Sequence, residues 1–362
     1  MPSSARDGYL GYVHSFRGFA ILNVVAIHAF ALAIIIPRDW AADPTGPLTV
    51  LNETLFHDST IYFALISGLL FSSILRPRGY QSFYRSKAMY VLLPYIVCTI
   101  VFSLVRWDQT GTGILAWPSS WSDYIDSILP NLVHGEAQFT YWYIPVLLIL
   151  FAITPLLSAL TTAKSYAAIP AWLVMLAPLV FSRPDFGEGT SQIVAGTVIY
   201  FAGAYTVGVY LGNQLEPRLD RIAGYRKFLI AAAVLSSVIL IELQLAQVNR
   251  FGSFSLQESI FYVQKLSLAA LVLLWLRALE RKQPRWLTYF ANEAFSIYFL
   301  HVFFILLLAD LSWTFVHDKG FLPWSVYLAG PAYFAFALAM SVLVVRVLRL
   351  LLGRNSRLLI GS

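Results

Sequence analysis

Charged residues are scarce in this chain of 362 residues. They make up 12% of it, hydrophobic residues make up 58%, and the mean hydropathy is +0.68. A soluble domain carries about 25% charged residues, so the composition excludes an ordinary soluble protein and predicts a polytopic membrane protein. Apolar runs recur from end to end, and no long polar segment leaves room for a fused soluble module. We therefore expect one domain over residues 1–362.

Cysteine is nearly absent as well. Cys98 is the only one, so no intramolecular disulfide can form and the redox compartment cannot be inferred. Because Cys98 lies within an apolar run, we expect an inert buried thiol. The sequence also lacks internal repeats, low-complexity tracts and nucleic-acid-binding motifs, and we expect no nucleic-acid partner.

Long apolar runs are what the sequence does contain. A membrane-spanning helix needs about 20 mostly apolar residues. This criterion predicts an all-α integral membrane protein, a single bundle of about ten transmembrane helices. The predicted spans lie near 16–36, 58–75, 88–106, 141–161, 167–182, 193–212, 228–248, 259–279, 287–309 and 326–350.

The basic residues predict the orientation of these spans. Loops on the cytoplasmic side carry an excess of Lys and Arg. With the N-terminus inside, the inner connections and the tail hold Arg76, Arg78, Arg85, Lys87, Lys164, Arg218, Arg221, Arg226, Lys227, Arg281, Lys282, Arg285, Arg354 and Arg357. The outer connections hold only scattered positive residues, such as Arg38, Arg183, Arg250 and Lys319. Both termini are therefore expected in the cytoplasm.

The longest connection, 107–140, falls on the outer side in this topology. From Trp121 onward, apolar residues recur at helical spacing at Ile125, Ile128, Leu129 and Leu132. This pattern predicts a short amphipathic helix on the outer surface. Its aromatic residues are expected to be interfacial anchors, with a sugar-stacking platform as the alternative.

The first apolar run, Ser15–Ile36, carries two ionisable side chains where a membrane helix should carry none. Eleven helical steps place Arg17 and His28 about 20° apart in azimuth and roughly 16 Å apart in depth. They therefore share a face of the helix. An ionisable group inside the bilayer costs at least about 2.5 kcal/mol and is by default a functional-site hypothesis.

Plainer interpretations of this run stay open. Arg17 could be the positive flank of a signal peptide with a cleavage site at Ala29–Ala31, or it could reach back to the interface. The run is long for a signal peptide and right for a span. His28 could be a neutral imidazole bonded to a neighbouring helix.

A second group of candidates lies at the cytoplasmic mouth of the third span. Arg85 and Lys87 are found there, with Tyr90 one turn deeper. Basic residues at this position often only set the topology. Alternatively, they form a phosphate clamp for a phosphorylated cofactor.

Five segments follow one another in a recognisable order along the chain. The first is the pair Arg17 and His28, with an Arg-x10-His spacing on the first predicted span. The others are IYFALISGLLFSSIL (Ile61–Leu75), FYRSKAMYVLLPY (Phe83–Tyr95), TYWYIPVLLILFAITPLL (Thr140–Leu157) and FANEAFSIYFLH (Phe290–His301). Together they resemble the membrane-bound acyltransferase 3 family of bacterial glycan modifiers, whose first span carries the same Arg-x10-His pattern. Any one motif is weak, but five in order are specific. The segment Gly196–Gly212 resembles the branch associated with exopolysaccharide operons.

The resemblance implies an O-acyltransferase of the bacterial inner membrane. The donor would be cytoplasmic acyl-CoA, carrying an acetyl or other short acyl group. The acceptor would be a sugar hydroxyl of an extracytoplasmic or lipid-linked polysaccharide, with membrane lipid and possible polysaccharide-synthase subunits as partners. His28 and Arg17 would be catalytic, and Arg17, Arg85, Lys87 and Tyr90 would bind acyl-CoA, with no permanently bound cofactor.

Two alternatives come from other classes of protein. One is an exporter of a polysaccharide or lipid-linked glycan without chemistry, which would need a continuous polar path through the bilayer. The other is a non-catalytic subunit of a glycan synthase, in which Arg17 and His28 would be dispensable.

Other intramembrane polar residues are candidates for the acceptor site or for support of the catalytic residues. They are Ser67, Tyr143, Glu242, Lys265 and His301. Glu242 and Lys265 fall at similar depth and are expected to form a structural ion pair, with acceptor binding as the alternative.

Two of the remaining candidates also have a structural explanation. Ser67–Gly68 is expected to permit close helix packing, and Tyr143 to belong to the outer aromatic belt. His301 lies five residues after Ser296, so these two need not share a face.

A last polar group lies at the outer mouth of the second span. It consists of Glu53, His57 and Asp58, a combination that can form a metal site. One His and two carboxylates in a predicted loop are weak evidence, and we predict no metal.

Overall fold

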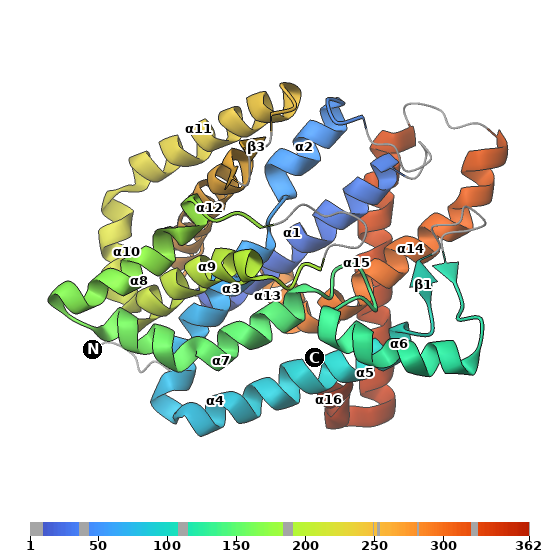
Figure 1. The fold of residues 1–362 in the computed structure, drawn as a ribbon, viewed down its shortest axis with the longest axis horizontal. Coiled ribbons are helices and arrows are strands. Elements are labelled where there is room, and N and C mark those ends of the chain that lie inside the picture. The colour runs from blue at the N-terminus through green and yellow to red at the C-terminus, as the bar shows by residue number, and fades with distance from the viewer. Residues whose placement is uncertain are drawn as a thin grey trace.

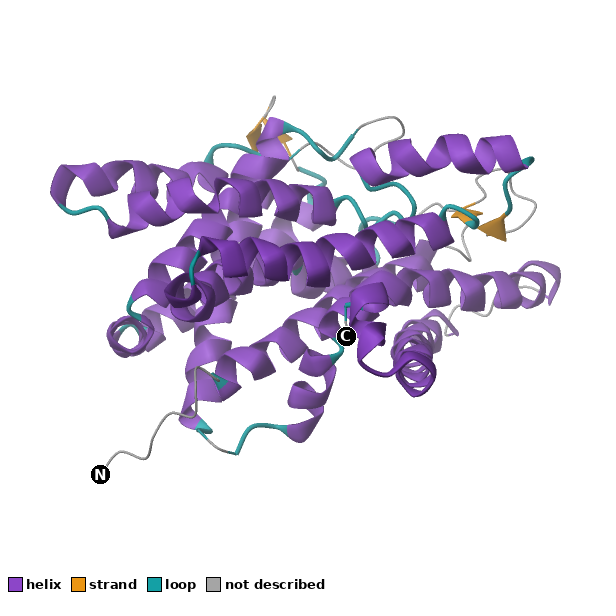
Figure 2. Cartoon of the chain, turned by 90° about the horizontal axis from the view of Figure 1, so that it is seen from below, coloured by secondary structure: helices purple, strands orange, loops and turns teal. Residues whose placement is uncertain are grey.

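The computed structural model describes residues 10–35, 43–107, 115–183, 191–248, 250–251, 254–280, 282–319 and 325–361. In these ranges the chain is a helical bundle (Figure 1), and its strands form only two short antiparallel pairs (Figure 2). Ile36, Arg38 and Arg281, which entered the span and charge predictions, lie outside the described residues.

The α-helices follow one another along the chain as α1 (Gly11–Ile35), α2 (Pro47–Phe56), α3 (Thr60–Leu70), α4 (Tyr80–Lys87), α5 (Leu93–Phe102), α6 (Trp121–His134), α7 (Tyr143–Thr162), α8 (Ile169–Leu176), α9 (Ala195–Asn213), α10 (Leu215–Gly224), α11 (Arg226–Leu245), α12 (Leu256–Ala278), α13 (Arg285–Asn292), α14 (Ala294–Lys319), α15 (Ser325–Leu352) and α16 (Ser356–Ile360). The strands are β1 (Arg106–Trp107) with β2 (Leu115–Ala116), and β3 (Arg250–Phe251) with β4 (Phe254–Ser255).

Eight helical stretches among the described residues have the length and hydropathy of a membrane span. A ninth is a pair, Tyr143–Ala152 and Thr154–Thr162, that bends by 56°. Pro155 lies within this helix and removes a backbone donor from it. Helices are expected here because the bilayer offers no water to backbone N–H and C=O groups, so each segment must satisfy its own. The predicted class, an all-helical multi-pass membrane protein, is confirmed.

One predicted span does not reach this length. The run predicted at 167–182 forms the shorter apolar helix Ser165–Leu179. It consists of α8 flanked by two 3-10 turns, and Pro178 lies in the second turn. Proline interrupts the helical hydrogen bonding, so an apolar run of sufficient length gives a helix that is too short.

The second span begins earlier than predicted. It runs from Pro47 to Arg78 rather than from residue 58, with a break between α2 and α3. Asp58 has φ of +57° at this break. The prediction was wrong because Glu53, His57 and Asp58 look like loop residues, whereas Asp58 is buried and its neighbours are partly buried inside the bundle.

Helices α3 and α9 approach each other through glycine. A Cβ atom added at Gly68 would lie 2.1 Å from the carbonyl oxygen of Tyr205, and one added at Gly208 would lie 2.0 Å from that of Leu65. Backbone therefore packs directly on backbone, as small residues allow in membranes. Close packing is thus confirmed as the role of Gly68, while Ser67 beside it is buried in α3.

Helix α6 is the predicted amphipathic helix. The side chain of Ser120 caps its N-terminus by accepting the N–H of Asp123, and Gly135 ends it in the left-handed conformation. Its apolar stripe is exposed, with Trp121, Ile125 and Leu129 exposed by 75%, 62% and 69%. A stripe turned away from the protein fits a helix at the membrane interface.

The short helix α16 folds back against α5 after the last span. The hydroxyl of Ser296 donates to the carbonyl of Ile360 at 2.9 Å, and the thiol of Cys98 lies 3.8 Å from the carbonyl of Leu359. Cys98 is buried, as the sequence predicts.

Candidate active site

Arg17 and His28 both face α14. The Cζ atom of Arg17 lies 5.5 Å from the centroid of the Phe295 ring, and the ring centroid of His28 lies 5.5 Å from that of His301. Phe295 and His301 are on α14, which packs along α1. The prediction that Arg17 and His28 share a face is therefore confirmed.

Arg17 has no ion-pair partner among the described residues. It is half-buried, and its Nε atom is buried without a hydrogen-bond partner. Glu293 lies within electrostatic range, but both of its carboxylate oxygens bind the guanidinium of Arg349, each at 2.7 Å. A guanidinium left without a carboxylate in the protein is suited to bind an anionic ligand.

Lys87 is the member of the predicted phosphate clamp that the structure places near Arg17. The two cations lie within electrostatic range of each other. The Nζ atom of Lys87 is 4.5 Å from the Phe151 ring centroid and 5.6 Å from that of Phe83. Arg85 and Tyr90 are exposed, and among the described residues neither forms a hydrogen bond, ion pair or ring contact with Arg17.

His28 sits between two other rings. Its centroid lies 5.2 Å from that of Phe139 and 5.5 Å from that of His301, and the side chain is half-buried. His57 is also within electrostatic range of it. In the described part of the chain, His28 makes no hydrogen bond, so both ring nitrogens are available to a ligand.

His301 is fully buried, and its tautomer follows from its contacts. Its Nδ1 atom lies 3.0 Å from the carbonyl oxygen of Ile297 and 2.8 Å from that of Tyr298. Carbonyl oxygens only accept hydrogen bonds, so Nδ1 carries the hydrogen in the neutral ring and Nε2 carries the lone pair. Nε2 is buried with no hydrogen-bond partner among the described residues.

The segment between α6 and α7 covers this pair of histidines. Phe139 contacts His28, the Tyr298 hydroxyl donates to the carbonyl of Thr140 at 2.5 Å, and the Tyr141 hydroxyl donates to the carbonyl of Phe299 at 2.7 Å. Phe139 was not among the site residues predicted from the sequence. The segment's rich aromatic content was the available signal, but it was assigned to the membrane interface.

Tyr143 is buried rather than interfacial. It is 2% exposed, and its ring packs against those of Phe201 and Tyr298. Its hydroxyl is buried without a hydrogen-bond partner among the described residues. The expectation that Tyr143 belongs to the outer aromatic belt is therefore wrong, and acceptor binding remains a prediction.

The expected ion pair between Glu242 and Lys265 does not form. Glu242 is exposed on α11, whereas Lys265 is fully buried on α12. Lys265 donates to the carbonyl of Leu55 at 2.8 Å. Leu55 belongs to the last turn of α2, where helix carbonyls lack partners and a cation is favoured, so Lys265 stabilises the break in the second span.

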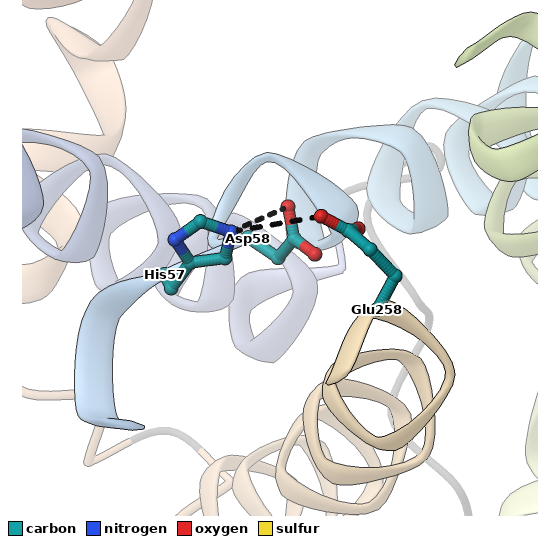
Figure 3. A group of neighbouring side chains, drawn as sticks. All are labelled: His57, Asp58 and Glu258. Carbon is teal, nitrogen blue, oxygen red and sulfur yellow. Dashed lines mark ion pairs between the residues drawn. The ribbon is translucent and has the colours of Figure 1, made fainter. Parts of the chain in front are cut away.

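The break also holds an ionic cluster of Glu53, His57, Asp58, Arg183 and Glu258, in which Asp58 and Arg183 are buried and the other three are partly buried. Arg183 binds Asp58 at 2.5 Å and both carboxylate oxygens of Glu258, at 2.9 and 3.0 Å. His57 binds Glu53 through Nδ1 at 2.6 Å, and its Nε2 lies 3.0 Å from the Arg183 guanidinium. Figure 3 shows His57 and Asp58 at the break facing Glu258 on α12.

Arg183 occupies the position that a metal ion would take in this cluster. Ligand atoms of His57, Asp58 and Glu258 lie within 4.8 Å of one another. Burial alone would lower the pKa of Arg183, but Asp58 and Glu258 outweigh it and raise that pKa above its ordinary value. A permanent guanidinium thus neutralises the two carboxylates, and a second cation at the same place would be repelled.

The interface between α1 and α14 thus holds one cation, Arg17, and two imidazoles, His28 and His301. Arg17 can bind an anionic group, and the ring of His28, farther along α1, can accept a proton or form a bond to an acyl carbon. These features define a multi-pass membrane protein with the parts of a group-transfer site.

The comparisons with known proteins identify the class of reaction. Residues 10–348 match the family model described as "Acyltransferase domain", and the chain therefore belongs to this family of membrane acyltransferases. The chain is also 21% identical, over 307 residues, to the Bacillus subtilis (strain 168) protein YfiQ, whose name describes a membrane-bound acyltransferase; the match covers 80% of each chain. No solved structure matches the chain.

Proposed function

We propose that this acyltransferase moves an acetyl or other short acyl group from cytoplasmic acyl-CoA to a sugar hydroxyl of an extracytoplasmic or lipid-linked polysaccharide. The observation that carries the proposal is the placement of Arg17 and His28 on one face of α1, both turned toward α14. The resemblance to glycan modifiers of exopolysaccharide operons in the bacterial inner membrane supports the acceptor class.

Arg17 positions the donor in this proposal. Eleven helical steps separate its Cα from that of His28 by about 16 Å along the axis, a distance suited to the extended pantetheine arm of coenzyme A. The phosphates would lie at Arg17, with Lys87 adding positive charge nearby. The thioester would then lie beside His28.

His28 acts at the reacting carbon. A neutral imidazole is a suitable base for a hydroxyl near pH 7. Either it removes the proton of the acceptor hydroxyl during direct transfer, or it carries the acyl group transiently as an acyl-imidazole.

The test compares surface glycan from cells with and without the protein. The expected result is that the same amount of polymer is made and exported in both, but that base-labile acyl ester is lost without the protein. Polymer that carries its ester yet stays inside the cells would contradict the proposal and indicate an exporter.

A further inference from the structure

We propose that His301 is a positioning residue for His28, accepting an N–H hydrogen bond from its ring during acyl transfer. This inference rests on the proposed function and adds a second imidazole to the site. His301 lies on α14, far from α1 in sequence, and the structure brings the two rings to a centroid separation of 5.5 Å.

The tautomer of His301 leaves its Nε2 atom as a hydrogen-bond acceptor. Its Nδ1–H is directed at the carbonyl oxygens of Ile297 and Tyr298, at 3.0 and 2.8 Å. Nε2 must therefore present a lone pair, and it has no donor among the described residues. Leaving such an atom unpaired inside a protein costs about 1–3 kcal/mol, so a donor from a catalytic partner is the expected compensation.

The two rings lie at a distance that allows one direct hydrogen bond between them. Each ring nitrogen lies about 1 Å from its centroid, and a hydrogen bond adds about 3 Å between nitrogens. The observed separation of 5.5 Å therefore accommodates one direct bond after a small turn of the His28 ring. His28 is free to turn because it makes no hydrogen bond within the described part of the chain.

This bond would fix which nitrogen of His28 acts as the base. When one ring nitrogen of His28 donates to His301, the other carries the lone pair and can take the acceptor proton. The hydroxyl O–H bond breaks as the C–O bond forms, His28 holds the proton, and the departing thiolate takes it back as the C–S bond breaks. The hydrogen bond to His301 stabilises the imidazolium that exists in between.

The experiment uses membranes that contain the full-length chain and the host's glycan, supplied with radiolabelled acetyl-CoA. Incorporation of label into glycan is measured at several donor concentrations for the wild type, His301→Ala, His301→Gln, His28→Ala and the double alanine variant. His134→Ala is the matched control, since His134 is an exposed histidine on α6.

A positioning role predicts a specific pattern. His301→Ala should lower the maximal rate about 10- to 100-fold, as deletion of a partner that orients a functional imidazole typically does, with an unchanged KM for acetyl-CoA. His301→Gln should recover most of this loss because its amide oxygen can accept the same hydrogen bond. The double variant should be no slower than His28→Ala, since the two rings act as a unit.

Three results would overturn the inference while leaving the proposed function intact. They are an undiminished rate in His301→Ala, a rate in His301→Gln no higher than in His301→Ala, and a double variant slower than His28→Ala. Failure of wild-type membranes to label glycan from acetyl-CoA and from other short-chain acyl-CoAs would instead overturn the proposed function.

Discussion

Arg349 holds Glu293 through two hydrogen bonds of 2.7 Å, one to each carboxylate oxygen. Glu293 is 4% exposed and lies between α13 and α14, within electrostatic range of Arg17. Because Arg349 engages this carboxylate, Arg17 keeps its charge available for a ligand.

Substitution of Arg349 should therefore weaken donor binding even though Arg17 itself is not substituted. In Arg349→Met, Glu293 loses its partner and attracts Arg17, and we expect the KM for acetyl-CoA to rise about tenfold, the effect of one charged hydrogen bond of about 1.5 kcal/mol. Initial rates of label incorporation across donor concentrations measure this. The double variant Arg349→Met with Glu293→Gln should restore the KM; a KM that stays high in the double variant would refute this explanation.

Lys265 should stabilise the fold through the carbonyl of Leu55. Lys265→Met removes this hydrogen bond and leaves the carbonyl of Leu55 without its donor, and we expect a loss of about 1–3 kcal/mol in the free energy of unfolding. Thermal unfolding of the detergent-solubilised protein checks this. Glu242→Gln is the matched control and should leave the midpoint unchanged; an equal loss in both variants would indicate that the two residues pair after all.

Arg183 should stabilise the break in the second span and exclude metal. Arg183→Met removes the guanidinium that pairs with the buried Asp58 and the partly buried Glu258, while His57 stays near both carboxylates. We expect the loss of this pairing to cost about 3 kcal/mol. The same substitution leaves His57, Asp58 and Glu258 with ligand atoms within 4.8 Å. Added Zn²⁺ should therefore raise the unfolding midpoint of the variant but not that of the wild type. A lower unfolding midpoint of the wild type in the presence of a chelator would contradict the conclusion that Arg183, and not a metal ion, lies between these three side chains.

Gly68 and Gly208 should be intolerant of any side chain. A Cβ atom at either would lie about 2 Å from a backbone carbonyl oxygen of the facing helix, so α3 and α9 must separate. We expect Gly68→Ala and Gly208→Ala to lose about 1–3 kcal/mol each, as over-packed sites do. Gly224→Ala is the control because its Cβ would meet nothing within 4 Å. Wild-type unfolding midpoints in both variants would show that the two helices can move apart freely.

The spans could be predicted because apolar runs of sufficient length leave the chain little alternative to a helix. The predicted bounds were wrong where a proline shortens the helix within an apolar run, or where polar residues lie within a span. Pro178 divides the run at 167–182, and the polar residues near His57 hide the first half of the second span. The neutralising partners of that group, Arg183 and Glu258, are far away in sequence, so no local pattern could reveal that Asp58 is buried.

Part of the site could also be predicted from the sequence. Helical geometry along one helix is fixed, so the shared face of Arg17 and His28 follows from their spacing alone. Contacts between residues of different helices do not follow from the predicted depth of those residues in the membrane. Glu242 and Lys265 lie at similar predicted depth yet do not meet, whereas His28 and His301, on the first and ninth predicted spans, do.

The most direct test of the proposed mechanism is the ester content of surface glycan in cells that carry His28→Ala or Arg17→Ala. Neither substitution removes a hydrogen bond within the described part of the chain, so both variants should insert in the membrane at the wild-type level. We expect base-labile ester to fall to the level of cells without the protein in both. Wild-type ester content in His28→Ala, at equal protein level, would contradict the mechanism.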